Sequence, residues 1–349
     1  MGLLPGHWPP LDKPPPITED HNKLVDLSKV AKAQPDTLTN VMAGKCPNND
    51  LYCDWTCTNC IRNETDIDKC PNSGDWGLTL DDGPSEYTPA VLDYLDANNI
   101  KVTFFVVGSR VVENYETLQR AHKSGHQIGV HTWSHPYLTT QSNNQIIAEL
   151  QWTSDAINAA IGVRPKYMRP PYGDYDDRIR DIAKQLGYKI VIWDKDTNDW
   201  LSDGDKSFNL NWVEGNFTEW VKDPSKTGHI SLEHDLYKDA AAQVPSVIPI
   251  VKGAGYTIKP VADCFGDNYY QTNSTLPQQT PTTVSVSYTS LTSSLSSQST
   301  SRPSQSTSKP SQQNPTNNSS VLRPKYFDYS LWSFIIGTIL FSCAFLLIN

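Results

Sequence analysis

Between residues 76 and 262, short apolar runs alternate with longer amphipathic stretches, and this alternation constrains the fold more than any other feature of the sequence. Nearly continuous apolar runs are typical of strands whose two faces are both covered, as in a parallel sheet. The runs expected as strands are residues 76–80, 101–108, 127–131, 167–168, 189–193, 228–234 and 256–260. The stretches expected as helices are residues 88–97, 115–124, 144–161, 177–186, 217–221 and 240–251. This alternation predicts a β/α architecture with a parallel sheet, open or closed into a barrel.

The segments on either side of this region differ in composition. Residues 1–74 form a Pro-rich and Cys-rich N-terminal extension with one expected helix over residues 20–33, and residues 75–265 form the expected β/α domain. Residues 266–330 are rich in Ser, Thr, Gln, Asn and Pro, a composition that buries little apolar area. We expect this segment to be a disordered, O-glycosylated stalk. Residues 331–349 form a hydrophobic tail.

The seven cysteines are unevenly distributed. Cys343 lies in the apolar tail, and the other six suffice for three disulfides whose pairing the sequence leaves open. The alternative is a zinc site on the C-x-x-C formed by Cys57 and Cys60, but a zinc ribbon requires a second such pair, which the sequence lacks. We therefore expect disulfides and an oxidising compartment. The candidate disulfide cysteines are Cys46, Cys53, Cys57, Cys60, Cys70 and Cys264.

The end of the chain resembles a membrane-attachment signal. The last 19 residues carry no charge and follow a short polar stretch and a group of small residues. Small residues, a spacer of roughly 8–12 positions and a terminal apolar tail form the pattern of a GPI signal. The candidate attachment sites are Asn317, Asn318 and Ser319. An ordinary single-span anchor is the alternative, but no Lys or Arg follows the apolar run.

The expected localisation is therefore the cell surface, with the chain GPI-anchored to the plasma membrane, the cell wall or both. No signal peptide is visible in the first residues, so we expect one to precede the given sequence or to have been processed away. N-x-[ST] sequons agree with a secretory route. The candidate glycosylation sites are Asn63, Asn216, Asn273, Asn317 and Asn318.

The charge of the chain excludes one class of function. The net charge of −9 argues against nucleic-acid binding, because affinity for phosphates depends on clustered Lys and Arg. The 10 Trp and 16 Tyr would suit stacking on sugar rings, although aromatic residues also fill cores. A neutral glycan is compatible with this composition, and nothing in the sequence implies a protein partner.

Titratable or cationic side chains follow five of the expected strands directly. In β/α folds the active site gathers at the carboxyl ends of the parallel strands, so we expect these side chains to lie close together. Five strand ends that carry Asp, His or Arg are not typical of ordinary solvated loops. The residues are Asp81, Asp82, His131, His135, Arg169, Asp199 and His234.

Three of these residues form a candidate metal site. Two histidines at positions i and i+4, His131 and His135, can present their imidazoles on one side of a turn, and Asp82 would complete three protein ligands. Three ligands leave a coordination position open for water or substrate, as in catalytic zinc sites. For the HTWSH segment alone, a pair of surface histidines would be the simpler interpretation. Together with the acidic pair of LDDGP, the metal interpretation is favoured.

Metal-assisted hydrolysis also requires a base and an acid. Asp81 adjoins a candidate ligand and is the natural base, which Arg169 would pair with and hold ionised. His234 is the natural acid, because imidazole titrates near neutral pH. Asp199 would orient His234 and stabilise its charge. An oxyanion contact is expected from a backbone N–H after the Pro170–Pro171 turn.

Five segments together resemble the ordered motifs of carbohydrate esterase family four, the NodB-like polysaccharide deacetylases. The segments are TLDDGP (79–84), HTWSH (131–135), RPPYG (169–173), DTNDW (196–200) and SLEH (231–234). The resemblance implies a distorted (β/α) barrel and a bound Zn²⁺, or sometimes Co²⁺. It also implies hydrolysis of N-acetyl groups on a β-linked N-acetylglucosamine polymer.

For single residues, the resemblance implies the same base, acid and ligands as the strand ends do. It further implies that the backbone N–H of Tyr172 contacts the oxyanion, that Trp200 forms an aromatic wall of the groove, and that Leu232 lines a pocket for the acetate methyl group. One departure is Leu80, which stands where the family usually has Phe. This position is expected in a buried strand, so we expect a change in packing and not in chemistry.

The surroundings of the motifs select the substrate. A Cys-rich N-terminal segment, a Ser/Thr stalk and a GPI-like tail together resemble fungal chitin deacetylases, which convert chitin to chitosan. The alternatives are a deacetylase of another acetylated polysaccharide, such as peptidoglycan or xylan, and a non-catalytic glycan-binding protein of the cell wall. A further alternative makes residues 46–70, with Tyr52 and Trp55, a separate carbohydrate-binding module. We favour a disulfide-laced extension that packs on the barrel, because this segment is too short to fold without cross-links.

Overall fold

The computed structural model of the chain describes residues 2–46, 49–223 and 227–272. Residues 273–330 of the expected stalk, the apolar tail with Cys343 and the sites at Asn273, Asn317, Asn318 and Ser319 lie outside the described residues. The expected start of the stalk at residue 266 is wrong, because residues 266–272 are held on the domain: the backbone N–H of Gln271 donates to the carbonyl oxygen of Arg164 at 2.9 Å, and Asp267 accepts from Lys166 and Lys189. Within the described part, no helix is long and apolar enough to cross a membrane. Of the two sequons within it, Asn63 is exposed and Asn216 is half-buried in a helix.

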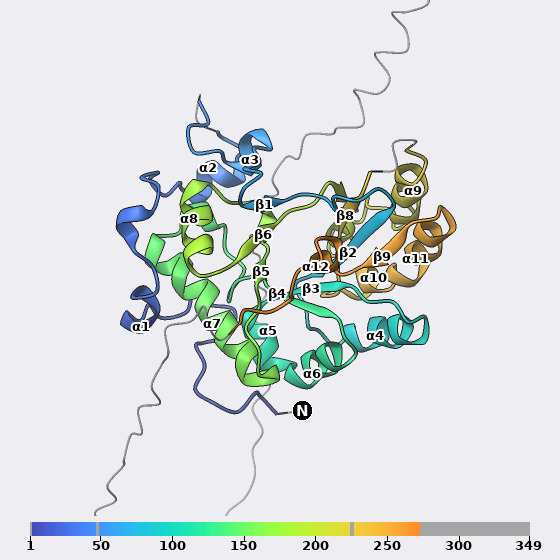
Figure 1. The fold of residues 1–349 in the computed structure, drawn as a ribbon, viewed down its shortest axis with the longest axis horizontal. Coiled ribbons are helices and arrows are strands. Elements are labelled where there is room, and N and C mark those ends of the chain that lie inside the picture. Colours follow the sequence, from blue (N-terminus) through green and yellow to red (C-terminus); the bar gives the residue numbers. More distant parts are fainter. Residues whose placement is uncertain (1, 47–48, 224–226, 273–349) are drawn as a thin grey trace, which may run out of the picture. The chain divides into compact units, whose positions relative to one another are not determined.

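Nine strands of the described chain form one sheet in the order β1-β6-β5-β4-β3-β2-β8-β7, with β9 also paired to β2. All of these pairings are parallel. The strands run through the middle of the domain with helices around them (Figure 1), which confirms the expected distorted (β/α) barrel. The strands are β1 (Asp66–Ile67), β2 (Asp75–Asp81), β3 (Thr103–Val106), β4 (Gln127–Val130), β5 (Tyr167–Met168), β6 (Lys189–Val191), β7 (Lys195–Asp196), β8 (His229–His234) and β9 (Thr257–Lys259).

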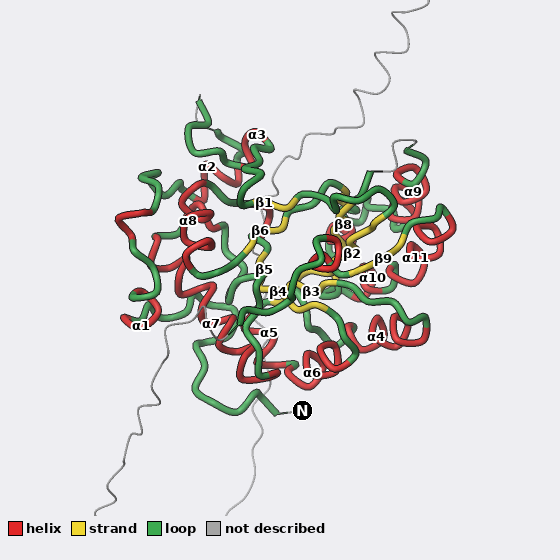
Figure 2. Tube along the Cα trace, viewed as in Figure 1, coloured by secondary structure: helices red, strands yellow, loops and turns green. Residues whose placement is uncertain are grey.

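The helices of the barrel follow the strands in the expected alternation, and Figure 2 shows them outside the yellow strands. The α7 helix begins where the side chain of Ser142 accepts a hydrogen bond from the backbone N–H of Gln145, and it ends at Gly162 in the left-handed conformation. The helices are α4 (Thr88–Ala97), α5 (Gly108–Glu113), α6 (Tyr115–Lys123), α7 (Asn143–Ile161), α8 (Asp177–Gln185), α9 (Asn211–Trp220), α10 (Lys238–Ala241), α11 (Val244–Gly253) and α12 (Val261–Cys264).

Three of the expected helices are wrong in extent. The helix expected over residues 217–221 is α9, which begins six residues earlier, at Asn211. The helix expected over residues 240–251 is two helices, α10 and α11, because Pro245 favours a helix start, and it lies in the first turn of α11. The helix expected over residues 20–33 is only α1 (Glu19–Asn22) and a 3₁₀ turn, η1 (Leu27–Lys29). Backbone N–H groups of this segment bond to α8 side chains instead, Asp26 N to Gln185 and Ala31 N to Asp181, both at 2.8 Å. Tertiary contacts here outweigh helix propensity.

The core has two layers because strand side chains alternate between the two faces of the sheet. One layer lies between the strands and the helices and includes Leu78, Leu80 and Phe104, all buried. Leu80 therefore stands in the buried strand position expected of it. The other layer forms a second cluster that includes Phe105, Tyr167, Val191, Ile230 and Val261.

The six candidate cysteines form three disulfides, Cys46–Cys57, Cys53–Cys60 and Cys70–Cys264. The first two lie within the N-terminal extension: Cys57 belongs to α3 (Trp55–Thr58), and Cys53 and Cys60 stand on either side of this helix. The α2 helix (Leu38–Met42) precedes them. The third joins the segment before β2 to α12, which follows the last strand, across 194 residues.

The extension packs on the barrel and contributes a strand to it. Its β1 pairs with β6 at the end of the sheet. The buried guanidinium of Arg180 on α8 contacts the carboxylate of Asp66 at 2.9 Å and also donates to the carbonyl groups of Cys53 and Cys60. These contacts favour the packed extension over a separate binding module.

Candidate active site

The carboxyl ends of the central strands bring the motif residues together. In the sheet, Asp81 at the end of β2 lies beside His234 at the end of β8. His131 and Arg169 directly follow β4 and β5, whose last residues Val130 and Met168 are paired. These side chains therefore lie at one edge of the sheet, as expected from their positions at the carboxyl ends of parallel strands.

Asp82, His131 and His135 present one ligand atom each to a common point, all within 4.8 Å of one another. The Nε2 atoms of His131 and His135 lie 3.4 Å and 3.1 Å from Oδ1 of Asp82. This oxygen is buried and has no hydrogen-bond donor among the described residues. Three converging donor atoms around an unsatisfied carboxylate oxygen fit a divalent cation of the zinc class.

The orientation of His131 also fits a metal ligand. Its Nδ1 atom lies 2.8 Å from the backbone carbonyl oxygen of Arg169. A carbonyl can only accept, so this contact places the proton on Nδ1 and leaves the lone pair of Nε2 free to bind a cation. A backbone carbonyl in this position is a common outer contact of metal-bound histidines.

The turns that carry the ligands adopt an uncommon backbone conformation. Asp82, Thr132 and His135 have φ values of +77°, +64° and +57°, in the left-handed region that non-glycine residues rarely adopt. Such conformations each cost of order 1–3 kcal/mol and persist only where surrounding contacts enforce them. The left-handed conformation is thus part of how Asp82 and His135 reach the common point.

Asp81 and Arg169 form a fully buried ion pair. Nη1 of Arg169 donates to Oδ1 of Asp81 at 2.9 Å, while Arg169 itself is 0% exposed. The guanidinium also donates to the carbonyl groups of Val191 and Ile192 and lies over the ring of Phe105, 4.4 Å from its centroid. These contacts fix the guanidinium, and through it one oxygen of Asp81. The other carboxylate oxygen, Oδ2, faces Nε2 of His131 at 3.8 Å.

His234 and Asp199 form a second dyad across the site. Nδ1 of His234 lies 2.6 Å from Oδ1 of Asp199, and the backbone N–H of His234 donates to Oδ2 at 2.9 Å. Burial alone would lower the pKa of His234, but Asp199 and the pair Asp82 and Asp81 outweigh it and raise that pKa to about 10. The imidazole is therefore protonated at neutral pH and can donate a proton.

The three residues expected to contact substrate lie close in sequence to Arg169, His234 and Asp199. Tyr172, in the 3₁₀ turn η3 (Pro171–Gly173), has a φ of +60°, and the residue is 40% exposed. Its ring stacks on Tyr137 with centroids 3.9 Å apart and meets the ring of His135 edge-on at 4.6 Å. Leu232, on β8 beside Thr79, is buried. Trp200 directly follows Asp199 in the 3₁₀ turn η4 (Asp199–Ser202) and is half-buried.

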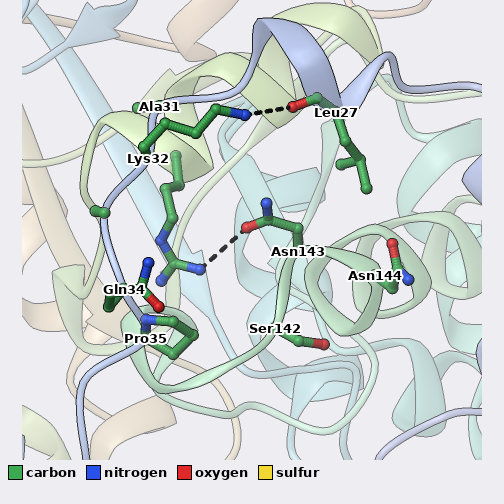
Figure 3. A pocket seen from close by; sticks show the side chains of 10 residues that line it. Leu27, Ala31, Lys32, Gln34, Pro35, Ser142, Asn143 and Asn144 are labelled. Atoms are coloured by element: carbon green, nitrogen blue, oxygen red, sulfur yellow. Dashed lines mark hydrogen bonds between the residues drawn. The ribbon is translucent and has the colours of Figure 1, made fainter.

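Two cavities of about 300 Å³ each lie outside this cluster. Figure 3 shows one of them, between the N-terminal segment and the start of α7; there Lys32 donates to the carbonyl oxygen of Leu27 and Arg178 donates to Asn143. None of the candidate site residues lines it. The other is lined by residues of the turn after β2 and by Arg110, whose Nη1 donates to the carbonyl oxygen of Asp82 at 2.9 Å.

Two buried carboxylates at the site were not expected from the sequence. Asp235 follows His234 directly, so its position beside a candidate acid was the one available signal. Glu149 lies on α7, far in sequence from the residues it contacts, Trp133 and Ser134, and no pattern marked it. Burial raises the pKa of both carboxyl groups to about 7.

Comparison with known proteins agrees with this geometry. Residues 68–191 match the model of the family described as polysaccharide deacetylase. Chitin deacetylase 1 of Saccharomyces cerevisiae is 35% identical over 265 residues, which cover 75% of this chain and 81% of that protein. Chitin deacetylase 1 of Cryptococcus neoformans var. grubii is 42% identical over 308 residues, which cover 80% of this chain and 63% of that protein.

Comparison with solved structures gives the same family. The structure of the chitin deacetylase from the fungal pathogen Colletotrichum lindemuthianum matches with a TM-score of 0.56 and 31% identity, over 60% of this chain and 97% of that one. The chain belongs to the polysaccharide deacetylase family. Within it, the chain is similar to fungal chitin deacetylases, although it spans less than two thirds of the length of the Cryptococcus proteins it matches.

Proposed function

We propose that this protein hydrolyses the N-acetyl groups of N-acetylglucosamine units in chitin, which releases acetate and leaves chitosan. The observation that carries the proposal is the arrangement of two dyads around one cation site. Asp81 with Arg169 and His234 with Asp199 lie at neighbouring strand ends, and the Asp82, His131 and His135 cluster lies beside them. Amide hydrolysis needs this combination of a base, an acid and a polarising charge.

Asp82, His131 and His135 would hold the cation, Zn²⁺ or Co²⁺. Such a cation would polarise the amide carbonyl and lower the pKa of water at the site. Asp81 takes the proton of the attacking water, and Arg169 keeps its carboxylate oriented for that purpose. His234 gives a proton to the leaving amine as the C–N bond breaks, so the products are acetate and a free amino group on the sugar.

The protonation states at the site support these roles. The raised pKa of His234 means that the acid carries its proton before the reaction starts. Asp199 stabilises that imidazolium and orients the ring through two hydrogen bonds. The backbone N–H of Tyr172 would contact the developing oxyanion. Leu232 would line the pocket for the acetyl methyl group, and Trp200 would form a wall of the groove.

The choice of chitin follows from the relatives, which are named chitin deacetylases. The three disulfides support an oxidising compartment and thus a secreted protein. We propose that residues 75–265 are the catalytic domain, that residues 1–74 are an extension of it, and that a stalk and a GPI-signal tail tether it to the cell surface. Cell-wall remodelling would be the role of an enzyme in that place.

The test is acetate release from chitin oligomers by the full chain, produced through a secretory host so that the disulfides form. Metal-free protein, zinc-loaded protein and zinc-loaded Asp81→Asn protein are compared. We expect acetate only from the zinc-loaded wild type. Parallel assays on peptidoglycan and acetylxylan identify a different substrate. Zinc-loaded protein that releases no acetate from any of the three would replace this proposal with a non-catalytic glycan-binding protein.

A further inference from the structure

The left-handed residues of the described chain concentrate at the candidate site. In the whole described chain, nine non-glycine residues have positive φ. Four of the nine belong to the turns that follow β2, β4 and β5: Asp82, Thr132, His135 and Tyr172. Two of the four are candidate cation ligands. A backbone that holds ligands in an unfavourable conformation needs contacts from outside the turn to keep it there.

Asp235 supplies such contacts to the turn after β2. Its carboxylate is 0% exposed; Oδ1 accepts from the backbone N–H of Gly83 at 3.1 Å, and Oδ2 accepts from the hydroxyl of Thr88. The backbone carbonyl of Asp235 accepts from the hydroxyl of Ser85 at 2.6 Å. The residue after the candidate acid His234 thus holds the turn that carries the ligand Asp82.

The carboxylate of Asp235 approaches the backbone of Gly83 closely. A Cβ atom at this glycine would stand 2.4 Å from both carboxylate oxygens of Asp235, well inside contact distance. The close approach is possible only because residue 83 has no side chain. The carbonyl group of Gly83 is also held, since it accepts from the backbone N–H of Val107 at 3.0 Å.

Glu149 acts on the turn after β4 in the same way. It lies on α7, is 0% exposed, and accepts three hydrogen bonds through its carboxylate. The donors are the backbone N–H of Trp133 at 2.8 Å, the backbone N–H of Ser134 at 2.9 Å and the hydroxyl of Ser134 at 2.7 Å. Both N–H groups lie between the ligands His131 and His135, so one carboxylate fixes the segment that spaces the two imidazoles.

We propose that Asp235 and Glu149 are positioning residues for the cation site, each of which anchors one ligand-bearing turn through backbone N–H groups. The inference rests on the proposed function in that it assigns a cation to Asp82, His131 and His135. Neither carboxylate reaches the ligand atoms, so the expected effect is on the affinity and geometry of the bound cation. Outer contacts of this kind typically change metal affinity by about 10- to 100-fold.

The test measures metal binding by the full chain without any substrate. Metal-free Glu149→Gln and Asp235→Asn proteins are titrated with Co²⁺, whose visible absorption reports coordination geometry, and with Zn²⁺ against a chelator. We expect both variants to bind about 10- to 100-fold more weakly than wild type and to give an altered Co²⁺ spectrum. The control is Asp267→Asn, because Asp267 also accepts several hydrogen bonds but anchors Lys166 and Lys189 at the amino ends of β5 and β6. It should lower the melting temperature and leave affinity and spectrum unchanged.

Milder variants keep the test decisive if the first ones fail to fold. Ser134→Ala removes one of the three bonds to Glu149, and Thr88→Val removes the hydroxyl that donates to Asp235. Each should weaken Co²⁺ binding by a smaller factor, and Asp235→Asn with Thr88→Val should be non-additive. Folded variants with wild-type affinity and spectrum would overturn the inference. Wild-type protein that binds zinc tightly but releases no acetate would overturn the proposed function alone.

Discussion

The indole ring of Trp55 lies directly against Gly173, so that a Cβ at this glycine would stand 2.4 Å from the ring. Trp55 belongs to the disulfide-bonded extension, and Gly173 belongs to the turn that carries Tyr172. The backbone N–H of Trp55 also donates to the carbonyl oxygen of Tyr175 at 3.2 Å, and its ring meets Trp193 edge-on with centroids 5.1 Å apart. The extension is therefore part of the wall that shapes this turn.

Replacement of this glycine should destabilise the protein by two separable effects. Gly173 has a φ of +68°, so Gly173→Ala adds left-handed strain of about 1–2 kcal/mol and a steric conflict with the indole. The control is Gly162→Ala. Gly162 has a φ of +75° and open space around it, so this substitution adds left-handed strain without a steric conflict. Denaturant unfolding should show a larger loss of unfolding free energy for Gly173→Ala than for Gly162→Ala. Adding Trp55→Ala should remove the steric part, and equal losses for the two alanine variants would contradict the steric contact.

The dyad of His234 and Asp199 predicts a change in the pH profile. Asp199 raises the pKa of His234, so Asp199→Asn should lower it, and the imidazole should lose its proton at a lower pH. Because the acid must be protonated, the alkaline limb of kcat/KM should move to lower pH, with a fall in the maximum rate.

The matched control for this prediction lies on the same strand. At the start of β8, Nδ1 of His229 lies 2.6 Å from Oδ2 of Asp194, a similar dyad away from the ligand cluster. Asp194→Asn should leave the position of the alkaline limb unchanged. If the two variants shift it equally, His234 is not the group that titrates.

Asp174 predicts a pH dependence of stability. Burial raises the pKa of its carboxyl from 3.8 to about 7, even though the backbone N–H and the hydroxyl of Thr139 both donate to it. Between these two pH values the folded protein keeps a proton that the unfolded chain releases. The free energy of unfolding should therefore fall as pH rises from about 4 to about 7, by at most about 1.4 kcal/mol per pH unit from this group.

The measurement is urea unfolding of wild type and Asp174→Asn at several pH values across that range. Asn cannot ionise, so the variant should show a flatter dependence than the wild type, and the two should run parallel above about pH 7. Identical slopes for both proteins below pH 7 would show that Asp174 does not titrate in this window.

The disulfide between Cys70 and Cys264 should contribute more stability than either disulfide of the extension. It closes a loop of 194 residues, whereas Cys53–Cys60 closes one of 7. In the chain-entropy account, a disulfide stabilises the fold because it restricts the unfolded chain, and it does so more when it closes a longer loop. Disulfides typically contribute about 2–4 kcal/mol to the free energy of unfolding. Replacing both cysteines of the long loop by Ser should lower the melting temperature further than the same change at Cys53 and Cys60. The reverse order would show that strain or packing dominates.

Much of the site could be predicted because one geometric rule applies to it. The ends of parallel strands meet at one edge, so Asp81, His131, Arg169 and His234 could be expected together from strand assignments alone. The central pairing of β2 with β8, which places Asp81 beside His234, does not follow from the strand pattern. It depends on how the sheet is ordered, and many orders share the same local sequence pattern.

The anchors of the site could not be predicted for a different reason. Glu149 looks like an ordinary polar residue of a helix, and only the packing of α7 brings it under the turn at Ser134. The short strand β1 was missed because two residues, Asp66 and Ile67, are too few to show a period. Such features depend on contacts between distant segments, which hydrophobic patterns do not encode.

The bond between Cys70 and Cys264 makes the chain between them a covalent ring. Strands β2 to β9 all lie inside this ring, together with every candidate catalytic residue and cation ligand. A protease that cuts one peptide bond of the ring leaves two polypeptides that the disulfide still joins, so no fragment is released. After such a cut, Asp81 and His234 would still belong to one molecule, and only reduction of the disulfide would let the two parts separate.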